Sequence, residues 1–405
     1  MKNNSIPEKL ILVGIIFYPL QVFTLPVYGS VFDASIFLIL LATILIAFRN
    51  FKIRHQTFIW MLFFSCSQVI IFSILQVAPL YRLINGLIWF GGLVLVFLSR
   101  NLIEYKKKFI AKLIIVNLLI SAVYCFVTAG IEGLLSRPQA WFSEPSFAGL
   151  SFYSASAGLF GVLMLLKAKL SARIAVFMLA LIFFLAGLLT LSMHVVSFGI
   201  VIFLVLTLRL SIKQLPITIL IISLFAGLLM LLLEIDHFSS RVQVTGVVSN
   251  LSTLAWLYGY DQMLSAVSRS PLFGMGLGST GYFPFDSEYA DIMSESNVGI
   301  LNVTDAYSAF FRIVIELGVP FILFLSAYLW CRYIDFKRYI AYHMIHHSQN
   351  FEPTVFLFIF SITMIIGILI KEPTFSRSFV YIAWVILVSC LPMEARTYNQ
   401  KEIRE

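Results

Sequence analysis

Long apolar runs separated by short polar segments make up almost the whole chain of 405 residues. Most runs are about 17 to 25 residues long, which an α-helix needs to cross a bilayer. We predict twelve spanning helices from this pattern. They lie near residues 10–27, 33–48, 57–77, 83–99, 110–129, 146–166, 175–191, 195–208, 216–234, 306–330, 354–371 and 376–392. The even number of spans predicts that both ends of the chain lie on the same side of the membrane.

One long polar segment, residues 235–305, interrupts this pattern after the ninth run. It divides the chain into residues 1–234, with nine spans and a short polar loop at 130–146, the segment itself, and residues 306–405, with three spans and a tail. The expected fold is an all-α polytopic membrane protein with one large loop region of short helices. We expect the chemistry to take place at the membrane face where that loop lies.

Composition and charge support this class and predict its orientation. The chain has 60% apolar residues, 12% charged residues and a mean hydropathy of +0.95, which excludes an ordinary soluble domain. In the predicted topology, 21 Lys and Arg residues lie on the side of the termini and seven on the opposite side. Basic residues are retained in the cytoplasm. The net charge of +8 therefore predicts cytoplasmic termini and an external long loop, and we expect no nucleic-acid partner.

The short external loop carries Arg137 and Glu144 directly before the sixth predicted span. Ser143 or Glu144 is suited to cap that helix, and Pro145 suits its first turn. Alternatively, Arg137 and Glu144 belong to one site, in which the guanidinium holds an anion and the carboxylate orients a hydroxyl. The loop sequence leaves both interpretations open.

Four polar residues, Asp305, Ser308, Arg312 and Glu316, head the tenth predicted span. Their spacing predicts one stripe on a helix. At about 1.5 Å per residue, Arg312 is expected roughly 10 Å along the axis from Asp305, within the apolar zone. A charge there costs at least about 2.5–3.5 kcal/mol unless it is paired or wetted. We therefore expect Glu316 to hold Arg312 while Arg312 presents its charge to an external cavity.

Further external cations rank lower as site residues. Arg82, Lys371 and Arg377 lie near span ends, where they are suited either to the same cavity or to anchoring at lipid headgroups. The glycine-rich run 274–278 follows no strand of a βαβ unit, so we predict a tight turn and no nucleotide site. The acidic residues are interpreted as a solvated face, and no metal site is predicted. They are Asp286, Glu288, Asp291 and Glu295.

The order of these features resembles the O-antigen polymerase (Wzy-type) family, which is related to the O-antigen ligases. The resemblance covers roughly residues 130–320. It rests on Arg137 followed by Ser143-Glu144-Pro145-Ser146, on Ser240-Arg241, on Arg269-Ser-Pro-Leu-Phe-Gly-Met-Gly-Leu-Gly278, and on Asp305-Ala-Tyr-Ser-Ala-Phe-Phe-Arg-Ile-Val-Ile-Glu-Leu-Gly318.

The resemblance implies an enzyme of the bacterial inner membrane that works on its periplasmic side. It would transfer glycan from a polyprenyl diphosphate to a sugar hydroxyl on a second lipid-linked repeat unit, with inversion and without metal or other cofactor. Asp305 is then the first candidate for the base and Glu144 the second. Arginines stabilise a leaving diphosphate. The candidates are Arg137, Arg241 and Arg312, followed by Arg269, Arg377, Arg82 and Lys371. Expected partners are the lipid-linked oligosaccharides, the bilayer and a protein that regulates chain length.

Two departures from the family pattern bear on the alternatives. Ligases usually carry His followed by Asn where this chain has Asp305 and Ala306, which favours a polymerase. Related proteins often have Ser-Arg after the seventh span, where this chain has Ser192-Met193-His194. An O-antigen ligase remains the alternative enzyme. A flippase for lipid-linked oligosaccharides is the alternative transporter, although the internal repeats typical of transporters are not evident.

Overall fold

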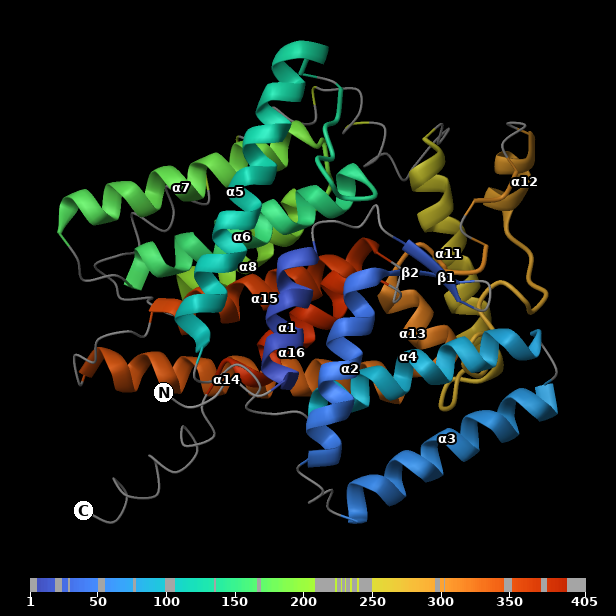
Figure 1. Cartoon of the computed structure of the whole chain (residues 1–405). Coiled ribbons are helices and arrows are strands. Elements are labelled where there is room, and N and C mark those ends of the chain that lie inside the picture. Colours follow the sequence, from blue (N-terminus) through green and yellow to red (C-terminus); the bar gives the residue numbers. More distant parts are fainter. Residues whose placement is uncertain are drawn as a thin grey trace.

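The computed structural model describes an almost entirely helical protein (Figure 1). The described residues are 6–18, 24–27, 30–49, 55–75, 78–98, 106–134, 136–165, 169–207, 250–295, 299–301, 303–345, 352–372 and 377–391, with single positions between 223 and 239. Among them, five helices are long and apolar enough to cross a membrane. The fold class is therefore helical with membrane-spanning candidates, and the total of twelve spans stays a prediction.

The helices and strands follow one another in a simple order. They are α1 (Ile6–Phe17), β1 (Thr24–Val27), β2 (Ser30–Asp33), α2 (Ala34–Arg49), α3 (His55–Leu75), α4 (Leu80–Leu98), α5 (Lys107–Glu132), α6 (Pro145–Leu165), α7 (Leu170–Leu189), α8 (Val195–Thr207), α11 (Leu251–Arg269), α12 (Glu288–Glu295), α13 (Ala309–Leu317), α14 (Val319–Ile345), α15 (Glu352–Lys371) and α16 (Ser378–Ser389). The five spanning candidates are α5, α6, α7, α14 and α15.

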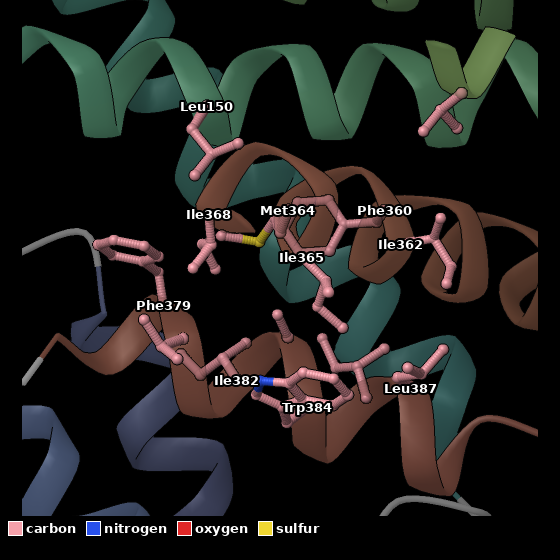
Figure 2. Packing of buried hydrophobic residues seen from close by; sticks show 14 of the residues in the cluster. Leu150, Phe360, Ile362, Met364, Ile365, Ile368, Phe379, Ile382, Trp384 and Leu387 are labelled. Atoms are coloured by element: carbon pink, nitrogen blue, oxygen red, sulfur yellow. The ribbon is translucent and has the colours of Figure 1, made fainter. Parts of the chain in front are cut away.

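Helix α15 lies at the centre of the core, between α6 and α16. Figure 2 shows Ile368 of α15 beneath Leu150 of α6, while Phe379 and Ile382 of α16 approach α15 from the other side. The backbones of α6 and α15 come close because Gly158 has no side chain: a Cβ there would lie 2.8 Å from a ring carbon of Phe356. Small residues allow membrane helices this close approach.

Helix α5 presents an apolar face outward. Four apolar residues of α5 follow one another at helical spacing, and each is at least half exposed. They are Val116, Ile120, Val123 and Val127. A contiguous exposed apolar surface indicates contact with membrane or protein. Together with the length of the helix, this face is suited to a lipid bilayer.

The prediction that residues 10–27 form one spanning helix is wrong. Helix α1 ends at Phe17, and residues 24–27 form strand β1, in which Leu25 pairs with Phe32 of β2. Pro26 lies in β1, and a proline within a helix lacks the N–H donor and clashes with the preceding turn. A short apolar stretch such as 24–27 does not by itself distinguish a strand from a helix, and the length of the whole apolar run was misleading here for that reason.

The tenth predicted span, 306–330, is also not one helix. It is divided at Gly318, which has a φ of 82° and separates α13 from α14. The left-handed conformation there is one that glycine adopts without steric cost. A Cβ on Gly318 would lie 2.5 Å from the carbonyl oxygen of Leu272, so the loop 270–278 fills the space beside the break.

The segment between α8 and α11 lies almost wholly outside the described residues. It includes the ninth predicted span, 216–234, and the candidate Arg241. The described part of the predicted large loop contains α11 and α12, which lie together at one side of the molecule (Figure 1).

Candidate functional site

Asp305 lies in a tight turn that immediately precedes α13. One oxygen of its carboxylate, Oδ1, accepts a hydrogen bond of 3.2 Å from the backbone N–H of Tyr307. Ala306 and Tyr307 both have positive φ, at 55° and 59°. Such conformations are costly for residues other than glycine and persist only where the surroundings enforce them.

Two glycines allow the surrounding structure to enforce this turn. A Cβ on Gly259 of α11 would lie 2.2 Å from the carbonyl oxygen of Ala306. A Cβ on Gly281 would lie 2.3 Å from the carbonyl oxygen of Val303. Backbone therefore packs directly against backbone on both sides of Asp305, which restricts where its carboxylate can lie.

Ser308 connects the Asp305 turn to the end of α15. Its Oγ accepts from the N–H of Phe311, as expected of a residue that caps a helix, and donates to the carbonyl of Leu369 at 2.7 Å. Trp256 of α11 donates its Nε1–H to the next carbonyl, that of Ile370, at 3.4 Å. The end of α15 is thus hydrogen-bonded both to the residue that follows the turn and to α11.

Arg312 and Glu316 form the ion pair expected from their four-residue spacing. Nε of Arg312 lies 3.0 Å from Oε1 of Glu316, which also accepts a 2.9 Å hydrogen bond from Thr280. Glu316 is almost fully buried, whereas the Arg312 side chain keeps 17% of its exposure. A buried carboxylate requires such partners because desolvation would otherwise be too costly.

The predicted stripe of four polar residues on one helix is corrected by this geometry. Asp305 lies in the turn, Ser308 is the N-cap of α13, and only Arg312 and Glu316 belong to the helix. Arg312 therefore lies in the first turn of a nine-residue helix, not deep in a long span as its spacing from Asp305 suggested. The break at Gly318 accounts for the difference.

The loop before α6 positions Arg137 and Glu144. Nε of Arg137 donates to the carbonyl of Thr190 at 3.5 Å. The backbone carbonyl of Glu144 accepts from the N–H groups of Phe147 and Ala148, so this residue begins the helix. Its carboxylate accepts from Ser146 Oγ at 3.2 Å and, within the described residues, from no backbone N–H. The helix start uses the carbonyl of Glu144 and leaves its carboxylate accessible for other contacts.

A buried pair that the sequence did not reveal lies next to these residues. Nε2 of His194, in the turn between α7 and α8, lies 2.9 Å from Oε1 of Glu372, directly after α15. Both residues are almost fully buried. Each stood out only as a polar residue beside apolar runs, and nothing in the sequence pairs two residues that are 178 positions apart.

The charge of Glu372 acts on both candidate bases. Burial, and secondarily the carboxylate of Glu372, raises the pKa of Glu144 above its usual range. Burial likewise raises the pKa of Asp305; the hydrogen bond from Tyr307 and the charge of Arg312 act in the opposite direction, and Glu372 adds to the increase. The carboxylate of Glu372 therefore repels each of the two candidate bases.

Four of the predicted cations lie around these carboxylates. Arg312 and Arg82 act on the charge of Asp305, and Lys371 and Arg377 act on that of Glu144. Arg82 donates from Nε to the hydroxyl of Tyr282 at 3.1 Å and lies over its ring, whereas Arg377 lies over the ring of Phe147.

A fifth cation, Arg137, joins the group. Burial lowers its pKa, and the charge of Glu144 acts in the opposite direction. The structure thus brings together Asp305, Glu144 and five of the seven predicted cations, from segments far apart in the sequence.

Two predicted cations do not join this group. Arg269 is exposed; its guanidinium donates to the carbonyl of Pro284 and lies over the ring of Phe283, so it fastens the loop after α11. Arg241 lies outside the described residues. No three His, Cys, Asp or Glu side chains in the described part of the chain are arranged to hold a metal ion.

The glycine-rich run 274–278 has a structural role. Gly274, Gly276 and Gly278 all have positive φ. A Cβ on Gly274 would meet the backbone of Glu316, and one on Gly278 would lie 2.5 Å from the carbonyl oxygen of Arg82. The run therefore packs between α4 and α13 and fixes the backbone of two site residues, as expected of the tight turn predicted there.

Comparison of the sequence with protein-family models and with curated proteins gives no significant match. The likeness to O-antigen polymerases therefore rests on the ordered motifs in the sequence.

Proposed function

We propose that this protein is a polysaccharide polymerase that joins lipid-linked repeat units at the periplasmic face of the bacterial inner membrane. The observation that carries the proposal is the convergence of Asp305 and Glu144 with Arg137, Arg312, Arg82, Lys371 and Arg377. All these residues come from helix ends, or from the loops and turns beside them, that the charge distribution predicts to be external. Apolar helices such as α5 are suited to the lipid tails of the substrates.

The reaction requires one base and several fixed cations. The hydroxyl oxygen of the acceptor sugar attacks the anomeric carbon of the donor, and the bond from that carbon to the diphosphate oxygen breaks. The hydroxyl proton passes to a carboxylate, for which Asp305 is the first candidate and Glu144 the second. The leaving polyprenyl diphosphate carries the electron pair away. Single displacement at the anomeric carbon inverts its configuration.

The cations favour this chemistry because charge develops on the diphosphate as it leaves. Arginine offers a planar, permanently charged fork that matches phosphate oxygens. In the sequence, Arg137 precedes Glu144 and Arg312 follows Asp305. Both arginine residues are partly exposed. Fixed cations in a partly desolvated site stabilise such charge more strongly than water does.

A chromosomal deletion distinguishes the candidate functions. Loss of a polymerase leaves a single repeat unit attached to the lipid core on a polysaccharide gel. Loss of a ligase leaves nothing attached while lipid-linked polymer accumulates, and loss of a flippase leaves unpolymerised lipid-linked units on the cytoplasmic side. Restoration by the wild-type gene and not by Asp305→Asn, at equal protein abundance, supports the proposal. A normal ladder with Asp305→Asn excludes Asp305 as the base and makes Glu144→Gln the next variant.

A further inference from the structure

Glu372 is an acidic residue that no motif in the sequence drew attention to, and the structure places it next to the Asp305 turn. It directly follows α15, whose last carbonyls are bonded to Ser308 and Trp256 beside the Asp305 turn. On its other side, Nε2 of His194 lies 2.9 Å from its carboxylate. Glu372 is therefore fixed both through its backbone and through its side chain.

The neighbours of His194 hold this pair rigidly. Ser197 donates its hydroxyl to the carbonyl of His194 at 2.7 Å, and the N–H of His194 donates to Ser192 Oγ. A Cβ on Gly367 of α15 would lie 3.0 Å from Nδ1 of His194, so the imidazole packs directly on the helix that carries Glu372. Burial lowers the pKa of His194, which favours a neutral imidazole that donates Nε2–H to the carboxylate.

We infer that Glu372, held by His194, is a positioning residue of the site, whose fixed negative charge keeps Asp305 and Glu144 able to accept the proton of the acceptor hydroxyl. This inference rests on the proposed function. A base works best when its pKa lies near the working pH, and an ordinary carboxylate lies well below it. A third carboxylate nearby raises the affinity of the other two for a proton because like charges repel.

Other charges also act on these groups and set the background for the effect. Asp305 faces Arg312 and Arg82 in addition to Glu372, and Glu144 faces Arg377, Lys371 and Arg137. Glu372 itself is paired with His194, and the charge of Lys371 acts on His194. The cations lower the pKa of the two bases, and the charge of Glu372 raises it. Its removal should therefore make both bases weaker.

The test measures the titration of the carboxyl groups without using polymerase activity. The purified full-length protein in lipid nanodiscs is treated with a carbodiimide and an amine over a range of pH, and mass spectrometry follows labelling of Asp305 and Glu144. Protonated carboxyl groups react, so the midpoint of the labelling curve reports each pKa. Glu372→Gln should move both midpoints to lower pH, and Glu372→Asp, which keeps the charge, should not.

Glu295→Gln is the matched control, because Glu295 is an exposed carboxylate at the end of α12 that does not act on either base. Unchanged midpoints in Glu372→Gln, or equal shifts in Glu295→Gln, would overturn the inference. If Glu372→Gln does not fold, His194→Gln provides the test, because it removes the group that holds the Glu372 carboxylate in place. The midpoints of Asp305 and Glu144 should then also move to lower pH, and unchanged midpoints would overturn the inference.

The two proposals can fail separately. If the protein polymerises repeat units but the midpoints do not move, Glu372 has no positioning role and the proposed function stands. If the midpoints move as expected but deletion of the gene leaves the surface polysaccharide unchanged, the charge coupling stands and the proposed function is wrong. In an active protein, Glu372→Gln should also move the acidic limb of the rate profile to lower pH and reduce the maximal rate.

Discussion

Gly259 and Ala306 lie in backbone contact: a Cβ on Gly259 would lie 2.2 Å from the carbonyl oxygen of Ala306. Helix α11 therefore presses on the turn that holds Asp305. Gly259 has no chemical role of its own, so its effect on the reaction would be exerted only through the position of that carboxylate. This contact gives a test that leaves every charged group unchanged.

Gly259→Ala should reduce polymerisation strongly while the protein is still produced and inserted. The added methyl group must displace the turn, and a displacement of about 1 Å at a reacting group costs on the order of a hundredfold in rate. The measurement is ladder formation at equal protein abundance. Gly130→Ala is the control, because Gly130 is also helical and a Cβ there meets nothing within 4 Å. Equal loss in both variants would indicate general damage.

The rate of the reaction should fall on the acidic side at a higher pH than for an ordinary carboxylate base. Burial and Glu372 raise the pKa of both Asp305 and Glu144. A base must be ionised, so activity is lost as the pH falls through this raised pKa. The pH profile of polymerisation by the purified protein checks the prediction. An acidic limb near pH 4, which is typical of unperturbed Asp and Glu, would contradict it.

Glu316→Gln should destabilise the protein and Arg312→Lys should mainly reduce activity. Removing the charge of the buried Glu316 leaves Arg312 without its counter-ion, which costs up to about 3–5 kcal/mol in a buried pair. Lysine keeps the positive charge at position 312 but loses the planar fork that pairs with Glu316 and that we propose binds phosphate. Thermal denaturation in detergent and the ladder assay separate these effects. A large loss of Tm in Arg312→Lys alone would reverse the assignment.

Gly158→Ala should lower the stability of the core. A Cβ at this position of α6 would lie 2.8 Å from the Phe356 ring and 2.9 Å from its backbone oxygen. The two helices must separate, and overpacking of this kind costs about 1–3 kcal/mol. The midpoint of thermal denaturation should fall, whereas Gly91→Ala, where a Cβ meets nothing within 4 Å, should leave it unchanged or raise it. A stabilised Gly158→Ala would show that α6 and α15 are packed less closely.

The hydrophobic pattern predicted most of the described helices because apolar runs of spanning length have few alternatives in a chain of this composition. It was wrong where the backbone changes direction within an apolar run. Pro26 lies in a strand, and Gly318 divides α13 from α14. In both places proline or glycine was visible, but the strength of the apolar signal outweighed it.

The candidate site could be predicted only where charge stood out against apolar surroundings. Arg312 and Glu316 were paired correctly because their spacing is a local property of a helix. Glu372 and His194 were missed because their contact depends on how α15 packs beside the turn between α7 and α8. Arg269 had suitable chemistry but is bound to the loop that follows it.

The most direct test of the central claim is a reaction with the purified protein and lipid-linked repeat units extracted from the deletion strain, in the presence of a metal chelator. Fixed cations and a carboxylate base predict that the wild-type protein forms a ladder of polymer and releases one polyprenyl diphosphate for each bond made. Asp305→Asn together with Glu144→Gln should form none. No polymer from the wild-type protein, or a normal ladder from the double variant, would contradict the account.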